Sequence, residues 1–172
     1  VAARGSQGKD VVIPKSVAVI GAGDTGMDCA ATAKLLGAEN VTVFCRGAKV
    51  PAYHEELQFV QSLGINVPTQ FSPQQFFGDD AVHGIMAQHA DGYSELKLKA
   101  ELVIYAIGQN IAAGEAFAGV TIEGNKIITQ DFQTSKAHIF AAGDATNGGS
   151  TVVQAVKEAK LAATAMLKFL AD

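Results

Sequence analysis

Apolar and polar residues follow two different periods between residues 16 and 69. Short β-branched runs are typical of strands, whereas Met27, Ala30, Ala31 and Leu35 recur at helical spacing before Gly37 supplies a stop signal. Strands that alternate with helices predict a parallel sheet. The predicted strands are residues 16–20, 41–45 and 65–69, and the predicted helices are residues 24–36 and 52–63. Together they predict a βαβαβ unit of the α/β class.

From Gln75 the pattern changes to shorter strands. The turn signals "GDD" at residues 78–80 and "ADGYS" at residues 90–94 predict an antiparallel meander. The apolar run "AELVIYAIG" at residues 100–108 is typical of a strand buried in a parallel sheet. Beyond it, short strands are expected around residues 120–122 and 126–129, an apolar strand at residues 138–144, and a long helix from about residue 151 to residue 170.

Composition and charge narrow the range of partners. The 172 residues are 48% hydrophobic and carry a formal net charge of -4, which suits a globular chain. Nucleic acid and anionic membranes are disfavoured as partners, because phosphate groups bind clustered Lys and Arg. No apolar stretch reaches the roughly 18 residues of a membrane span, and the first residues lack the pattern of a signal peptide. We therefore expect a cytoplasmic protein with no nucleic-acid partner and no membrane partner.

The reactive side chains do not form a recognisable catalytic or metal-binding cluster. Cys29 and Cys45 are sixteen positions apart, with no C-x-x-C motif and no Cys/His cluster, so neither an iron–sulfur site nor a redox disulfide is expected. His54, Glu55 and Glu56 lack the second histidine of a zinc helix and are typical of the polar first turn of a helix. We expect no metal and no catalytic side chain, so any electrons would come from a bound cofactor.

The stretch "VAVIGAGDTGMDCA" at residues 17–30 holds the clearest functional signal. Gly21, Gly23 and Gly26 form G-x-G-x-x-G between a predicted strand and a predicted helix. The first glycine permits the turn, the second lets the backbone approach a pyrophosphate, and the third lets helix and strand pack closely. The helix N-terminus offers free N–H groups to the phosphates. The motif predicts a Rossmann-like dinucleotide-binding site, and a glycine-rich turn without a ligand is the alternative.

The end of the second predicted strand indicates which dinucleotide binds. An acidic residue there binds the 2'-hydroxyl of NAD, whereas an arginine accommodates the 2'-phosphate of NADP. The strand ends in Arg46, and no Asp or Glu lies between Val41 and Val50. The sequence therefore favours NADPH, with Lys49 as a candidate second cation. A strand-end arginine that contacts no ligand is the alternative.

Four segments occur in a familiar order: "VIGAGDTGMDCA", "VFCRG", "YAIGQN" and "IFAAGDATNGGSTVVQAVKEAKLAA". From about Pro14 to Leu170 they resemble the flavin-dependent pyridine nucleotide-disulfide oxidoreductases, above all the glutamate synthase small subunit and the N-terminal module of dihydropyrimidine dehydrogenase. In that group an NADPH domain is inserted into an FAD domain, and the chain then returns to complete the FAD domain. The resemblance implies hydride transfer from NADPH to FAD, with the electrons passed on through a partner.

The resemblance also assigns roles to individual residues. It implies a pyrophosphate turn at residues 21–26, a 2'-phosphate contact at residues 46–47 and a crossing between domains at residues 106–108. It further implies that residues 143–144 bind the flavin ribityl chain and that residues 151–153 open a helix facing the flavin ring. The cofactor-binding candidates are Gly21, Ala22, Gly23, Asp24, Thr25, Gly26, Arg46, Gly47, Ala106, Ile107, Gly108, Gly143, Asp144, Thr151 and Val152.

The chain also departs from the pattern of that group. No earlier G-x-G-x-x-G precedes Gly21, Gly47 directly follows Arg46 where that group commonly has paired basic residues, and "KDVVIPKS" lacks the C-x-x-C of a thioredoxin-reductase-like role. We expect a fragment that lacks the N-terminal half of the FAD domain, so that FAD binds to the full-length parent and not to this chain. The expected divisions are residues 1–14 (a linker or expression remnant), 15–113 (the NADPH-binding domain) and 114–172 (a partial FAD-domain segment that ends in a long helix).

Two other functions remain open at this point. The chain could be a noncatalytic nucleotide-responsive or scaffold module whose apolar tail after about Gly114 binds a partner or a second copy of itself, because exposed apolar surface favours association. It could also be a self-sufficient Rossmann dehydrogenase, although the sequence shows no general acid or base near a substrate pocket. In the leading interpretation the partner is the missing half of the FAD domain or a separate redox subunit.

Overall fold

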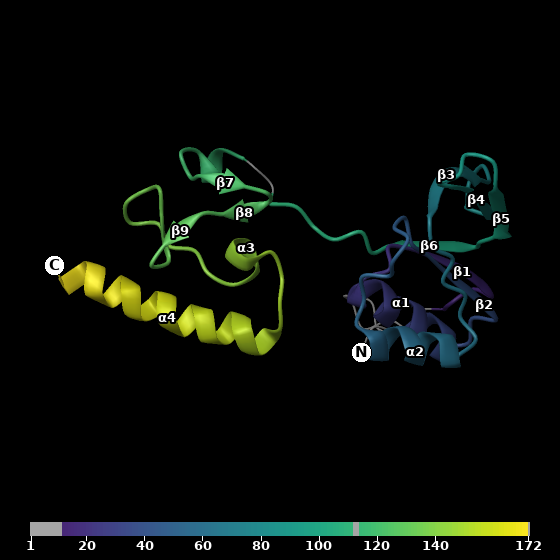
Figure 1. Ribbon diagram of the computed structural model, residues 1–172, viewed down its shortest axis with the longest axis horizontal. Coiled ribbons are helices and arrows are strands. Elements are labelled where there is room, and N and C mark those ends of the chain that lie inside the picture. Colours follow the sequence, from purple (N-terminus) through teal and green to yellow (C-terminus); the bar gives the residue numbers. More distant parts are fainter. Residues whose placement is uncertain (1–11, 112–113, 172) are drawn as a thin grey trace. The chain divides into compact units, whose positions relative to one another are not determined.

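The computed structural model describes residues 12–111 and 114–171, which form two compact units, one ending at Gly108 and one beginning at Gln109 (Figure 1). Unit 1 is built on a three-stranded parallel sheet. Its middle strand, β1 (Ser16–Ile20), pairs on one side with β2 (Asn40–Phe44) and on the other with β6 (Leu102–Tyr105). The parallel sheet predicted from the sequence is thus confirmed.

Both faces of this sheet are covered, because successive side chains of a strand point to opposite faces. On one face, Val17 and Val19 of β1 pack in a core with Met27 and Val60, which belong to the helices α1 (Asp24–Leu35) and α2 (His54–Ser62). An antiparallel meander covers the other face (Figure 1). Ala18 packs there in a second core with residues of the meander. The sheet edge between these two layers is where the candidate site lies.

The meander consists of β3 (Phe71–Phe77), β4 (Gly84–His89) and β5 (Glu95–Lys99), in that spatial order. The "GDD" and "ADGYS" segments lie between these strands, as the sequence predicts. Ile85 and Ala87 of β4 are fully buried against the parallel sheet. The meander begins at Phe71, earlier than expected, and this extension brings the start of β3 to the candidate site.

The predicted strand at residues 65–69 is reduced to two isolated parallel bridges. Thr42 pairs with Asn66 and Cys45 pairs with Thr69. In a regular parallel ladder the residue at position 68 would donate its N–H to β2, but proline has no N–H to donate. Pro68 still accepts a hydrogen bond from the N–H of Cys45 at 3.1 Å, so the segment stays beside β2 without forming a continuous strand.

Burial of β6 was expected on both faces, and that expectation is wrong. The strand is half-buried, and Tyr105 at its end is 61% exposed. Within the described residues β6 has one neighbour, β1, and therefore lies at an edge of the sheet. Residues at a sheet edge keep contact with solvent even when their sequence is as apolar as that of a central strand.

Unit 2 consists of short hairpins and one long helix. Its elements are η1 (Glu115–Phe117), β7 (Ile122–Glu123), β8 (Lys126–Ile127), β9 (Thr129–Gln130), β10 (Gln133–Thr134), α3 (Asp144–Asn147) and α4 (Val152–Ala171). The apolar strand expected at residues 138–144 does not form. In the described part of the chain it makes a single bridge, from Phe140 to Gln133, because no further strand of this unit lies beside it.

The long helix α4 agrees with the predicted helix, but its apolar side chains are largely exposed. Val153, Leu167 and Leu170 are 79%, 70% and 78% exposed, and Ala162 is the buried residue of the helix. Phe169 does pack edge-on against Phe140, with ring centroids 5.6 Å apart. None of the described helices combines the length and the apolar character that crossing a membrane requires.

Candidate functional site

A cavity of about 830 Å3 opens in unit 1 at the carboxyl ends of the parallel strands. Ligands of open α/β sheets bind at this edge. The cavity is lined by the ends of all three strands and by the start of β3. It brings together most of the unit 1 residues singled out from the sequence, namely Gly21, Ala22, Gly23, Asp24, Thr25, Arg46, Gly47, Lys49, Ala106, Ile107 and Gly108.

The three glycines of the turn differ in what a side chain at each position would meet. A Cβ at Gly21, whose φ is +109°, would overlap the carbonyl oxygen of Ala106. A Cβ at Gly26 would overlap the carbonyl oxygen of Gly21, so this glycine lies beneath the cavity and lets α1 approach the strand end. A Cβ at Gly23 would meet nothing within 4 Å. Gly21 and Gly26 are therefore required by packing, whereas Gly23 leaves free space at the cavity.

The turn leads directly into α1. Gly23 is the N-cap residue of that helix, and it has no side chain that could accept hydrogen bonds from the first-turn N–H groups. Uncapped N–H groups and the helix dipole favour a bound anion at such a position. The start of α1 and the free space at Gly23 fit the diphosphate of a dinucleotide.

The segment before α2 is tied to the glycine turn by two hydrogen bonds. The backbone N–H of Ala52 donates to the carbonyl oxygen of Ala22 at 3.2 Å. The backbone N–H of Tyr53 donates to Oδ1 of Asp24 at 2.9 Å. The carboxylate of Asp24 thus has a structural partner even though its side chain belongs to the candidate phosphate turn.

Two cationic side chains line the same cavity. Arg46 and Lys49 follow β2 and are exposed. Among the residues that the structure describes, neither forms an ion pair with an acidic side chain. An exposed cation without an acidic partner is available to an anionic ligand, so both residues fit a phosphate group of a nucleotide.

Sequence reasoning missed several residues of the cavity. Cys45 lines it, and its thiol lies 3.4 Å from the carbonyl oxygen of Gly47. Phe71, Ser72 and Pro73 of β3 also line it. Nothing in the glycine motif indicates these three positions, because they reach the cavity only through the pairing of the meander with the parallel sheet.

The other candidates lie in unit 2. Gly143, with φ of +71°, donates its N–H to Oε2 of Glu158 at 2.8 Å. Asp144 begins the short helix α3, and its Oδ1 accepts a hydrogen bond from the N–H of Ser150 at 3.3 Å. Thr151 precedes Val152, the first residue of α4, and its hydroxyl oxygen accepts the N–H of Gln154 at 3.2 Å.

Glu158 is a further residue that sequence reasoning missed, and it lies in unit 2. Its carboxylate accepts hydrogen bonds from Nε2 of Gln154 at 2.7 Å, from Nδ2 of Asn147 at 3.2 Å and from the N–H of Gly143 at 2.8 Å. These hydrogen bonds, the one from Gln154 first, hold the pKa of Glu158 below its usual range. Glu158 therefore fixes the turn at Gly143 to helix α4.

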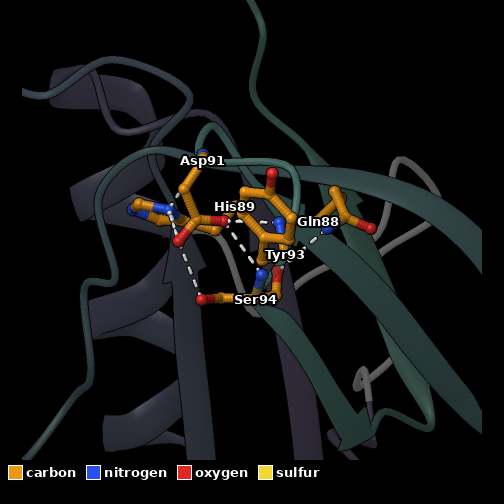
Figure 2. Close-up of polar contacts among 5 residues, drawn as sticks. All are labelled: Gln88, His89, Asp91, Tyr93 and Ser94. Carbon is orange, nitrogen blue, oxygen red and sulfur yellow. Dashed lines mark hydrogen bonds and ion pairs between the residues drawn. The ribbon is translucent and has the colours of Figure 1, made fainter.

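A polar cluster closes the turn between β4 and β5 (Figure 2). Asp91 accepts hydrogen bonds from the backbone N–H groups of Ser94 at 2.9 Å and Tyr93 at 2.8 Å, and its Oδ2 lies 2.9 Å from Nδ1 of His89. The hydrogen bonds from Ser94 and Tyr93 are the main reason that the pKa of Asp91 lies well below its usual range. The ring of His89 lies against the ring of Phe71, with centroids 4.9 Å apart. The cluster therefore packs against a residue that lines the cavity.

The remaining candidate side chains have structural places. The first turn of α2 is formed by His54, Glu55 and Glu56. The half-buried Cys29 packs against the core between the parallel sheet and the helices α1 and α2. In the described ranges, no three His, Cys, Asp or Glu side chains lie where they could together hold a metal ion.

Unit 1 thus has the architecture of the dinucleotide-binding class of α/β domains, in which a glycine turn follows the first strand of a parallel sheet. Comparison with known sequences agrees. The chain belongs to the pyridine nucleotide-disulphide oxidoreductase family, whose family model matches residues 3–159.

Curated relatives refine this assignment. The chain is 38% identical over 165 residues to the NAD-dependent dihydropyrimidine dehydrogenase subunit PreT of Salmonella typhimurium, which covers 95% of this chain and 39% of PreT. It is 32% identical over 173 residues to the NADPH glutamate synthase small chain of Azospirillum brasilense, covering 87% of this chain and 36% of the relative. The resemblance found in the sequence is therefore confirmed, and the chain spans about two fifths of the length of these relatives.

Solved structures show the same fold. The thioredoxin reductase of T. acidophilum matches with a TM-score of 0.83 at 21% identity, over 92% of this chain and 53% of the reductase. The Lactococcus lactis thioredoxin reductase matches with a TM-score of 0.81 at 25% identity, over 91% and 53% of the two chains. The expected α/β class, with a parallel sheet and an antiparallel meander, is thereby confirmed.

Proposed function

We propose that unit 1 binds NADPH in the cavity at the carboxyl edge of its sheet, as part of a longer flavin-dependent oxidoreductase. The observation that carries this proposal is that one cavity contains both the glycine turn and Arg46. The family supports a pyridine nucleotide as cofactor. When bound, NADPH would supply a hydride from its nicotinamide C4 for transfer to N5 of the FAD of the longer protein.

The residues of this chain would bind and orient the nucleotide. The backbone N–H groups at the start of α1 would bind the diphosphate, and the free space at Gly23 would accommodate it. Arg46 and Lys49 would bind the 2'-phosphate at the end of β2. Ala106–Gly108 line the cavity after β6. No side chain is required as a nucleophile, because positioning and the exclusion of water are the protein's contribution to hydride transfer.

The choice of NADPH over NADH rests on charge. Relatives differ by name, since PreT is called NAD-dependent and the glutamate synthase small chains carry NADPH in theirs. In this chain Arg46 directly follows β2, where it would contact the 2'-phosphate of the ribose, and no acidic residue lies between Val41 and Val50. A charge-assisted contact of this kind contributes about 1.5 to 3 kcal/mol, or about ten- to a hundred-and-fifty-fold in affinity.

We propose that unit 2 is part of a split FAD domain. In that arrangement Gly143 and Asp144 bind the ribityl chain, and Thr151 and Val152 open the helix that faces the flavin ring. The rest of the FAD domain would come from the parent protein. The names of PreT, a subunit, and of the glutamate synthase small chain support a partner redox subunit as the next electron acceptor.

Titration calorimetry with NADPH and NADH tests the cofactor assignment. We expect tighter binding of NADPH, and we expect Arg46→Ala to remove most of the difference between the two nucleotides. Lys97→Ala is the matched control, because Lys97 is an exposed cation of β5 that does not line the cavity. Equal affinity for both nucleotides, together with an Arg46→Ala variant that binds NADPH normally, contradicts the assignment.

One observation favours a second candidate function. Val153, Leu167 and Leu170 of α4 are exposed, and apolar surface of this kind promotes association. A noncatalytic scaffold module that assembles through α4 would sediment as dimers or larger species at increasing concentration. A monomer at every concentration contradicts this alternative and leaves the oxidoreductase proposal in place.

A further inference from the structure

Cys45 occupies a fixed position at the end of β2. Its backbone N–H donates to the carbonyl oxygen of Pro68 at 3.1 Å, and its own carbonyl oxygen accepts the N–H of Phe71 at 3.1 Å. The residue is 3% exposed and belongs to the core between the parallel sheet and the helices α1 and α2. Two hydrogen bonds to the neighbouring segment therefore hold the backbone of Cys45. They fix the position from which its side chain extends.

From this position the thiol reaches the loop that follows. Sγ of Cys45 lies 3.4 Å from the carbonyl oxygen of Gly47 and 3.6 Å from the carbonyl oxygen of Lys49. A thiol is a weak donor with a single hydrogen, so it donates to one of these two carbonyl groups at a time while remaining in contact with the other. The contacts hold the backbone of residues 46–49 close to the strand end.

The loop needs such a restraint because of its composition and its role. Gly47 is conformationally permissive, and the side chains of Arg46 and Lys49 are exposed without an acidic partner in the described part of the chain. The carbonyl oxygen of Gly47 accepts one further hydrogen bond, from the N–H of Gln70 at 3.1 Å. The direction of the Arg46 side chain therefore depends on the conformation of the loop backbone, which the thiol of Cys45 restrains.

We propose that Cys45 is a positioning residue for nucleotide specificity. Its thiol holds residues 46–49 so that Arg46 stays at the cavity and binds the 2'-phosphate of NADPH. Cys45 itself touches no phosphate and acts through Arg46. This inference rests on the proposed binding of NADPH in the cavity.

Calorimetric affinities for NADPH and NADH, measured on five variants of the whole chain, test the inference. We expect Cys45→Ala to weaken NADPH binding about three- to tenfold and to change NADH binding less than about twofold, because only the phosphate contact is lost. Cys45→Ser should recover much of the NADPH affinity, since its hydroxyl supplies one hydrogen-bond donor at the place of the thiol. The double variant Cys45→Ala/Arg46→Ala should bind NADPH no more weakly than Arg46→Ala alone.

Cys29→Ala is the matched control, because Cys29 is a half-buried thiol on α1 that does not line the cavity. It should leave both affinities unchanged. Thermal unfolding confirms that each variant is folded. If Cys45→Ala folds poorly, Cys45→Val takes its place, since valine fills the site without a donor and carries the same expectation.

The possible failures are distinguishable. Equal losses for both nucleotides, or additive losses in the double variant, overturn the role of Cys45 alone, because a residue that only supports the fold would act in this way. A wild-type chain that binds neither nucleotide, or an Arg46→Ala variant with unaltered NADPH affinity, overturns the proposed function and the role of Cys45 with it.

Discussion

Oδ1 of Asp24 accepts the backbone N–H of Tyr53 at 2.9 Å and so connects the first turn of α1 to the residue before α2. The same carboxylate places a negative charge on the turn that we propose to bind the diphosphate. The hydrogen bond and the charge have opposite consequences for the site, and substitutions of Asp24 separate them.

Asp24→Asn should bind both NADPH and NADH about two- to fivefold more tightly than the wild-type chain, because it keeps an acceptor for Tyr53 and removes the repulsion of an exposed charge. Asp24→Ala loses the acceptor as well and should unfold more easily, by about 0.5 to 1.5 kcal/mol. Calorimetry and urea unfolding measure the two effects. Weaker nucleotide binding by a folded Asp24→Asn variant would show that the carboxylate helps the ligand.

Alanine substitutions at two glycines of the turn should affect different properties, namely stability at Gly26 and NADPH binding at Gly23. A Cβ at Gly26 would overlap the carbonyl oxygen of Gly21, so Gly26→Ala should lower the free energy of unfolding by about 1 to 3 kcal/mol. A Cβ at Gly23 would meet no atom of the described residues within 4 Å beyond its chain neighbours, so Gly23→Ala should fold with a smaller loss and bind NADPH at least about tenfold more weakly. Chemical unfolding and calorimetry separate the two. Normal NADPH affinity in Gly23→Ala would place the diphosphate elsewhere.

The Asp91 cluster predicts a pH dependence of stability. Because the pKa of Asp91 is lower in the folded chain than in the unfolded chain, its contribution is present above the unfolded pKa of about 3.9 and is lost as the pH falls toward the folded pKa. Asp91→Asn should therefore be less stable than the wild-type chain at pH 7, and the difference should shrink below about pH 4. Urea unfolding of both chains at pH 7 and below about pH 4 measures this difference in the free energy of unfolding. A difference that stays constant over this range contradicts the account of the cluster.

Glu158→Gln should loosen the turn at Gly143. A carboxylate accepts all three hydrogen bonds from Gly143, Asn147 and Gln154, whereas an amide presents one oxygen and one N–H2 group to the same three donors. The backbone amide of Gly143 should exchange its hydrogen about tenfold faster, which corresponds to about one hydrogen bond. Glu123→Gln, in the exposed β7 strand, is the matched control. Unchanged exchange at Gly143 would show that Glu158 does not hold the turn.

Much of the fold follows from local sequence patterns. The β-branched run at residues 16–20 identified β1, and the glycine spacing located the turn and the start of α1. Three features depended on information that periodicity does not carry. Pro68 interrupted the third strand, β6 lay at an edge of the sheet, and in the described part of the chain residues 138–144 made only one bridge, to the two-residue strand β10.

The candidate site shows a similar division. Gly21, Gly23 and Arg46 were predicted because a motif and a strand end define their positions, and the structure places all three in one cavity. Cys45 and Phe71 could not be predicted in this way. Their roles depend on a loop conformation and on the pairing of distant segments, and neither leaves a periodic signal in the sequence.

The central claim is that the glycine turn and Arg46 together bind NADPH. The most direct measurement is a titration of the isotopically labelled chain with NADPH, followed through its backbone amide chemical shifts. The account predicts that the largest shifts fall on residues 21–26 and on Arg46, and that NADH moves the turn but moves Arg46 much less. Saturable shifts elsewhere in the chain, with the turn and Arg46 unmoved, would contradict it.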